Sequence, residues 1–282
     1  MSGDATIARL ACTAHMTTRI TDLFAKAFRE AEQSSMSGIS AERVGRSGFK
    51  VMLVCVSASL CLTMMFYLVR HDCLQGFARA LGAAEWLKHQ PDKRLVSLSW
   101  WASINVVFCL VVPVIIVKCV LREKLAAYGF RLRGAFKDYP VYAFVLIVVL
   151  VLVAYFSGTP GFLAMYPFYT PPTGTRLWPV FFLWETTYML QFVGVEFFFR
   201  GFMVHGTKER FGFYSVFVAT VPYCMFHFGK PIPETLAAIV AGIVLGVFSL
   251  KSGSIIPGFL LHCGTALSMD IAALLRKGMP DL

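Results

Sequence analysis

Residues 140–157 read PVYAFVLIVVLVLVAYFS and contain no charged side chain. A helix needs about 20 mostly apolar residues to cross the roughly 30 Å hydrocarbon core of a bilayer. Other stretches share this character, and the sequence predicts spans at 51–69, 97–120, 140–157, 177–206, 212–228, 235–250 and 253–275. Glu85 and Lys88 argue against an eighth span within 73–87. The expected fold is all-α, a polytopic transmembrane helical bundle of 7–8 helices.

The composition points to the same class of protein. Hydrophobic residues make up 57% of the 282 and charged residues 15%, with a mean hydropathy of +0.66, far above that of a soluble domain. If the spans alternate, 17 Lys and Arg residues lie on the side of the N-terminus and nine on the other, five of these in the 70–96 loop. The positive-inside rule then predicts a cytosolic N-terminus in a multi-pass protein, expected in a bacterial inner membrane. Anionic lipids, and no nucleic acid, are the partners that this charge suggests.

The domain organisation follows from where charge and apolar character change. We expect a cytosolic amphipathic or disordered arm over 1–48, N-terminal transmembrane helices and loops over 49–175, a core over 176–276 and a tail over 277–282. The stretch 158–174 carries four prolines and three glycines, so it is expected to form a re-entrant or surface loop. Gly242 and Gly246 have the GxxxG spacing that lets another helix backbone approach closely.

Four ionisable residues interrupt the apolar segments of the last third. Glu196 and Arg200 lie in GVEFFFRGF, His227 in MFHFGKP and His262 in GFLLHCGTAL. Such groups are costly at membrane depth and usually face a protein interior, have a partner and serve a function. Glu196 and Arg200 are four residues apart, on one helix face, where they can pair.

Depth suggests that these residues meet. At 1.5 Å per residue, Glu196 lies ~18 Å from the basic Lys208–Arg210 end of its span. Counted along their own spans, His227 lies ~22 Å deep and His262 ~15 Å deep. A carboxylate in an apolar pocket can act as general base on water, while imidazoles can orient the water, bind a metal or stabilise an oxyanion. That combination suits amide hydrolysis. The plainer alternatives are an ion pair that sets helix register and histidines bonded to backbone carbonyls.

The order of these motifs resembles the CPBP family, which comprises the CAAX prenyl endopeptidases and bacteriocin-processing proteins and is also called the ABI family. The resemblance rests on Glu196-xxx-Arg200-Gly-Phe, Tyr223-xxx-His227 and the late His262, and covers about 177–275. It implies an intramembrane protease that cleaves prenylated or other short peptide tails of a membrane-associated substrate.

Matched by position, Glu196 corresponds to the second glutamate of the family's EExxxR motif, and Arg200, His227 and His262 to its arginine and histidines. Val195 stands in place of the first, water-activating glutamate, and Ala266 in place of an asparagine that helps to hold the oxyanion. The resemblance thus implies Glu196, Arg200, His227 and His262 as catalytic residues, with Glu196 as general base or metal ligand.

Other residues are candidates for the missing roles. Tyr223, Thr265 and Asp270 are candidate binding residues. Thr265 could donate the hydrogen bond that Ala266 cannot, and Asp270 could orient a histidine. Glu185 is expected to be an interfacial or structural acid.

Zinc is a possible cofactor. Glu196, His227 and His262 would suffice as its ligands in a metalloendopeptidase, but the same three can also work on water alone.

Two hypotheses from other functional classes remain open. One is a catalytically inactive membrane scaffold or immunity protein that keeps the bundle and the ion pair. The other is a transporter with an intramembrane proton site, which would need inverted repeats that the two halves of the sequence do not show.

Overall fold

The computed structural model describes residues 41–172 and 178–278, apart from the side chains of 41–44 and 46. Residues Ser47–Leu282 form one compact unit, which contains all the contacts discussed below. Most of the predicted 1–48 arm lies outside the described residues. Helix α2 already begins at Ala41, so the last residues assigned to the arm are helical.

The described residues contain helices and no β-strand. In the N-terminal half the helices are α2 (Ala41–Leu68), α3 (His71–Ala80), α4 (Ala84–Lys88), α5 (Lys93–Val106), η1 (Val107–Val111), α6 (Val112–Ile115), η2 (Ile116–Val120), η3 (Leu125–Tyr128), α7 (Tyr139–Phe156) and α8 (Pro160–Met165). The C-terminal half holds α9 (Val180–Glu196), η4 (Phe197–His205), α10 (Gly206–Phe211), η5 (Gly212–Tyr214), α11 (Ser215–Met225), α12 (Ile232–Ser252) and α13 (Ile256–Lys277).

Five helices in the described part of the chain are long and apolar enough to cross a membrane. They are Ser47–Leu68, Lys93–Val120, Tyr139–Phe156, Ile232–Ser252 and Ile256–Lys277. Each corresponds to a predicted span, so the protein is an integral membrane protein with a helical bundle. Its orientation stays a prediction.

Two predicted spans have a different form. In the described part of the 177–206 segment, α9 begins at Val180 and the helix changes from α to π geometry after Glu196. The 212–228 segment contains the short 3₁₀ helix η5 and the 11-residue α11, which is too short to cross the hydrocarbon core alone. Pro222 lies inside this helix and the chain turns after Met225, which explains its early end. The predicted number of 7–8 spanning helices is therefore not established by the structure.

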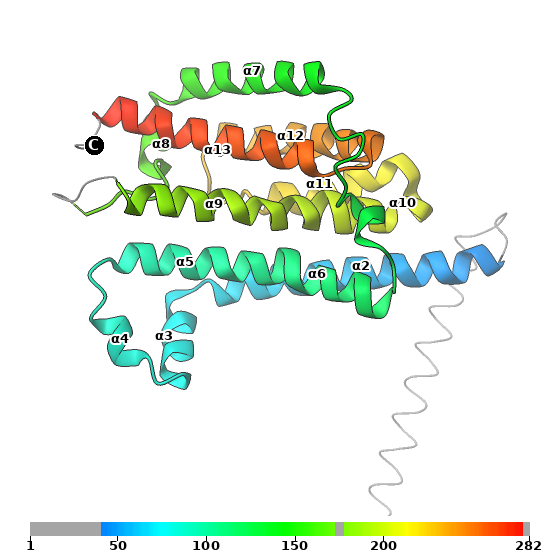
Figure 1. Cartoon of the computed structure of the whole chain (residues 1–282), viewed down its shortest axis with the longest axis horizontal. Coiled ribbons are helices and arrows are strands. Elements are labelled where there is room, and N and C mark those ends of the chain that lie inside the picture. The colour runs from blue at the N-terminus through cyan, green and yellow to red at the C-terminus, as the bar shows by residue number, and fades with distance from the viewer. Residues whose placement is uncertain (1–40, 173–177, 279–282) are drawn as a thin grey trace, which may run out of the picture. The chain divides into compact units, whose positions relative to one another are not determined.

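The α9–η4 helix occupies the centre of the bundle. Figure 1 shows α9 running between α5 on one side and α13 on the other, and both helices contact it. All nine residues of η4 are buried. A helix that is apolar on every side is expected at such a position.

The predicted GxxxG contact is confirmed between α11 and α12. A Cβ added to Gly242 would lie 2.9 Å from the Thr220 side chain, and one added to Gly246 would lie 2.7 Å from Val216. These glycines let α12 pack closely against α11 and so fix the turn between them, which carries His227.

Two connecting segments contain short helices. Within the predicted loop 158–174, α8 forms because Pro160 occupies the first helical position and the Thr159 side chain accepts from Phe162 N. The stretch predicted to be a re-entrant or surface loop therefore contains a six-residue helix. Between the first two spans, α3 and α4 form beside the start of α5 (Figure 1).

Candidate active site

Glu196 and Arg200 form an ion pair inside the bundle. Arg200 Nη1 donates to Glu196 Oε1 at 3.0 Å, and the two side chains are 2% and 0% exposed, respectively. The pair spans the change from α9 to η4. Such π segments occur frequently at functional sites.

His262 joins this pair from α13. Its Nδ1 lies 3.1 Å from Glu196 Oε1, and its ring stacks on Phe192 with centroids 4.1 Å apart. Because a carboxylate only accepts, His262 Nδ1 is the donor, and the neutral ring then presents Nε2 as an acceptor. The His262 side chain is 15% exposed, so it is the accessible member of a group whose carboxylate is fully buried.

Gly258 makes the contact between α9 and α13 possible. A Cβ at this position would lie 2.5 Å from Glu196 Oε2. The carboxylate therefore fills the space that any larger residue would need. Glu196 Oε2 is buried and has no hydrogen-bond partner among the described residues. Gly258 was not predicted as a site residue, although its spacing of four from His262 places both on one helix face.

Tyr223 connects the ion pair to the second histidine. The Arg200 guanidinium lies 3.9 Å from the centroid of the Tyr223 ring, in cation–π geometry. The same ring lies 4.7 Å from His227 and 6.5 Å from His262, measured between centroids. The two imidazoles therefore cannot lie further apart than the sum of these distances.

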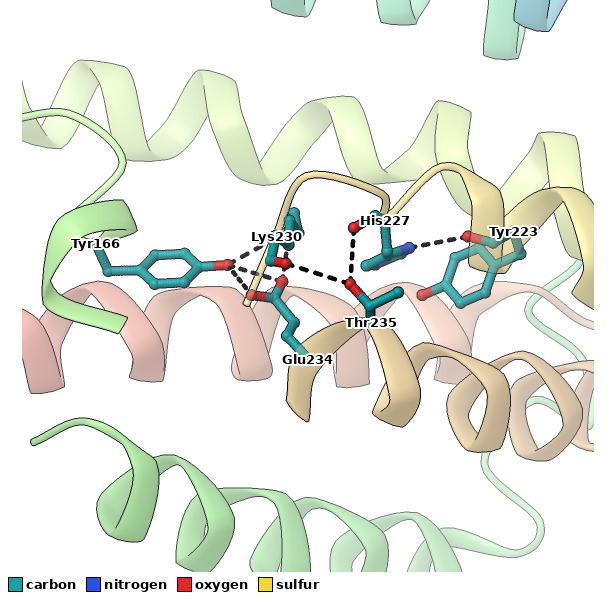
Figure 2. A network of polar contacts seen from close by, with 6 residues as sticks. All are labelled: Tyr166, Tyr223, His227, Lys230, Glu234 and Thr235. Atoms are coloured by element: carbon teal, nitrogen blue, oxygen red, sulfur yellow. Dashed lines mark hydrogen bonds and ion pairs between the residues drawn. The ribbon is translucent and has the colours of Figure 1, made fainter. Parts of the chain in front are cut away.

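His227 lies in the turn after α11, not on a spanning helix as the depth argument assumed. Its Nδ1 donates to the Tyr223 carbonyl at 2.9 Å, which again leaves Nε2 as the acceptor of the neutral ring. Thr235 Oγ1 donates to the His227 carbonyl at 2.9 Å. Figure 2 shows both contacts.

The turn that carries His227 is anchored by a second polar cluster. Lys230 Nζ pairs with Glu234 Oε1 at 2.6 Å, and Tyr166 Oη lies 2.8 Å from both oxygens of Glu234 (Figure 2). Burial and the neighbouring Glu234 carboxylate raise the pKa of the Tyr166 hydroxyl, which keeps it a donor. These residues hold the segment between α11 and α12.

Three other candidates make contacts away from this group. Thr265 Oγ1 donates to the Leu261 carbonyl of its own helix at 2.8 Å. Asp270 Oδ1 accepts from Phe168 N at 2.8 Å, and its carboxyl interacts with that of Glu185. Asp270 thus orients a backbone amide where a histidine was expected. Glu185 is buried, as a structural acid is, and not interfacial.

The two departures from the family motif lie in apolar surroundings. Val195 is 2% exposed and packs in the main hydrophobic core, which also includes Ala266. Neither position offers a polar group to a substrate.

The zinc site proposed from the sequence, with Glu196, His227 and His262 as ligands, stays a prediction. Among the residues that the structure describes, no group of three His, Cys, Asp or Glu side chains could hold a metal ion. Glu196 Oε1 already accepts from Arg200 and His262.

Residues 176–268 match the family described as Type II CAAX prenyl endopeptidase Rce1-like. This segment is Rce1-like. The match confirms the resemblance predicted from the motifs, and it contains Glu196, Arg200, His227 and His262. Neither the curated proteins nor the solved structures give a significant match. The Rce1-like match supports a CAAX-type intramembrane protease acting on a peptide in a membrane setting.

Proposed function

We propose that the protein is an intramembrane endopeptidase that hydrolyses a peptide bond near the end of a prenylated or other membrane-associated peptide. The observation that carries the proposal is the Glu196–His262 contact, in which a buried carboxylate holds an accessible imidazole. A carboxylate that fixes a histidine in one tautomer and stabilises its charged form is a recurring device for activating a nucleophile.

The roles follow from exposure and hydrogen bonding. His262 Nε2 accepts a proton from water, and the water oxygen attacks the scissile carbonyl. The imidazolium, stabilised by Glu196, then returns the proton to the leaving amine. Arg200 holds the Glu196 carboxylate in place through their ion pair, and Phe192 sets the plane of the His262 ring. This proposal moves the general base from Glu196 to His262, because Glu196 is fully buried against Gly258.

His227 supplies the second imidazole of the site. Its Nε2 is an acceptor, and its ring lies beside Tyr223, so it is suited to orienting the water or the leaving amine. The proposed steps use water and these side chains.

The test is cleavage of a synthetic peptide with a farnesylated cysteine followed by three residues, by purified full-length protein. We expect His262→Ala and His227→Ala each to lower kcat by about 10² to 10⁴, the usual worth of a positioned acid or base. Glu196→Gln should cause a similar loss, because a neutral amide cannot stabilise the imidazolium as the carboxylate does. Added imidazole should restore part of the activity of His262→Ala, whose site is accessible, whereas formate should not restore Glu196→Gln.

Val195→Glu tests the relation to the family site. If His262 is the base, a glutamate at this buried apolar position brings no gain. A rise in activity would show a weakened version of the family mechanism instead.

The apolar surroundings of Val195 and Ala266 favour a second candidate, a non-catalytic membrane scaffold with the same fold. If purified protein cleaves no peptide and Glu196→Gln leaves the cellular phenotype intact, the scaffold hypothesis explains the protein better than the peptidase hypothesis.

A further inference from the structure

The segment between the first two spanning helices encloses a cavity unrelated to the candidate active site. The cavity has a volume of about 350 Å³ and lies between α3, α4 and the start of α5. Its polar lining consists of His71, Gln75, Arg79, Lys88, Lys93 and Ser97, and none of its lining residues is acidic.

The cations are available to a ligand. Arg79 Nε donates to the Gln75 carbonyl of its own helix at 3.3 Å, and Lys88 has an exposed pairing with Glu85 at 2.7 Å. Lys93 Nζ has no hydrogen bond or ion pair with another described residue. All three side chains are exposed, so their charges face the cavity mouth and the solvent.

Charge distribution makes this cluster unusual. Of the nine Lys and Arg residues expected on the side opposite the N-terminus, five lie in the 70–96 loop. The positive-inside rule favours few cations on that side. Ligand binding by these cations would explain why they are concentrated beside the cavity.

The exposed apolar residues around the cavity are of the kind found at a membrane–water interface. Phe77, Leu81 and Trp86 are 51%, 66% and 60% exposed, although they are large and hydrophobic. Phe77 packs against Trp100 at the start of α5, with ring centroids 5.2 Å apart. Helix α2 ends at Leu68 and α5 begins at Lys93, so α3 and α4 lie where the two spans leave the bilayer. Aromatic residues are enriched at this level of a membrane.

We propose that this cavity binds the phosphate-bearing headgroup of an anionic phospholipid. Arg79, Lys88 and Lys93 hold the phosphate, His71, Gln75 and Ser97 contact the polar headgroup, and the acyl chains lie along Phe77, Leu81 and Trp86. Exposed Lys and Arg side chains close to the membrane surface attract anionic lipid headgroups. The site is independent of the proposed peptidase activity.

The experiment measures lipid binding to the purified full-length protein in neutral detergent by native mass spectrometry. The probes are short-chain phosphatidylglycerol, phosphatidylcholine with the same chains, and inorganic phosphate. The cavity variant is Arg79→Gln/Lys88→Gln/Lys93→Gln. Its matched control is Lys124→Gln/Arg133→Gln/Lys137→Gln, which removes three exposed cations elsewhere in the chain.

We expect phosphatidylglycerol to bind more tightly than either other probe, and its Kd to rise at least tenfold more in the cavity variant than in the control. A smaller difference between the two variants overturns the proposal, as does equally tight binding of phosphatidylcholine. Equally tight binding of inorganic phosphate also overturns it, because the ligand is then the free anion. If the triple variant does not fold, Lys93→Gln alone should weaken binding about threefold against Lys124→Gln, and no difference between these two overturns the proposal.

Discussion

Glu196 is held by residues from its own helix and from α13, and each contact has a separate energetic role. Arg200 and His262 share Oε1, while Oε2 packs against Gly258. A buried carboxylate is tolerated only with such compensation. Substitutions at its neighbours should therefore affect stability and activity to different extents.

Arg200→Ala should lower the free energy of unfolding by about 3–5 kcal/mol, because it leaves a buried carboxylate without its cation. Activity should fall as well. The measurement is thermal unfolding in detergent. Lys251→Ala, which removes an ion pair to Asp138 that is 63% and 27% exposed, should cost less than about 1 kcal/mol. Equal losses in the two variants would contradict a stabilising role for the buried pair.

Gly258→Ala should displace Glu196 and lower kcat by about 10²-fold, because a small shift of a positioning group has effects of this size. The added Cβ would lie 2.5 Å from Glu196 Oε2. Gly264→Ala on the same helix is the control, since its Cβ would meet only the end of Leu146, at 3.1 Å. Full activity of Gly258→Ala would show that the Glu196–His262 geometry is not needed.

At the scale of elements, the short α11 and the turn after it determine where His227 lies. Pro222 and the turn after Met225 end the helix early, and the glycines of α12 bring the returning helix close. The turn is then held by Thr235, Lys230 and Glu234. His227 depends on these contacts more than on the helix that precedes it.

Tyr166→Phe should loosen the turn that carries His227, because it removes the hydroxyl that binds both oxygens of Glu234. Hydrogen–deuterium exchange of backbone amides in 226–235 should become faster, whatever the activity. Tyr169→Phe is the matched control. It removes an equally buried hydroxyl that donates to Asp92 at 2.6 Å, outside this turn. Unchanged exchange in Tyr166→Phe would mean that Thr235 and Lys230 hold the turn without it.

For the whole molecule, ion pairs show which segments lie at the same end of the bundle. Lys50 in α2 pairs with Glu123 at 2.9 Å and with Glu209 of α10 at 3.0 Å. The start of the first span and the end of the α9–η4–α10 helix are therefore on one side. The α3–α4 segment follows the opposite end of α2.

The positive-inside rule predicts that the end with Lys50 and Glu209 is cytosolic. In a background without native cysteines, Arg210→Cys should react with a membrane-impermeant maleimide only after the cells are permeabilised. Lys88→Cys should react in intact cells. The reverse pattern would invert the topology and place the α3–α4 cavity in the cytosol.

The helical membrane fold, five of the spans and the four ionisable residues could be predicted from the sequence. Apolar length and the cost of a charge in hydrocarbon are local properties, readable without knowing which helices meet. The spacing of Glu196 and Arg200 likewise sufficed to predict their pairing, because one helix turn sets it.

Only the tertiary structure decided which atoms meet between helices. Thr265 and Asp270 lie on the same helix as His262, yet their side chains bind a neighbouring carbonyl and the Phe168 amide. Gly258 mattered because α9 approaches α13 at that point. The rotation of each helix about its axis, the α-to-π change after Glu196 and the early end of α11 depend on packing against neighbours, which no local sequence pattern encodes.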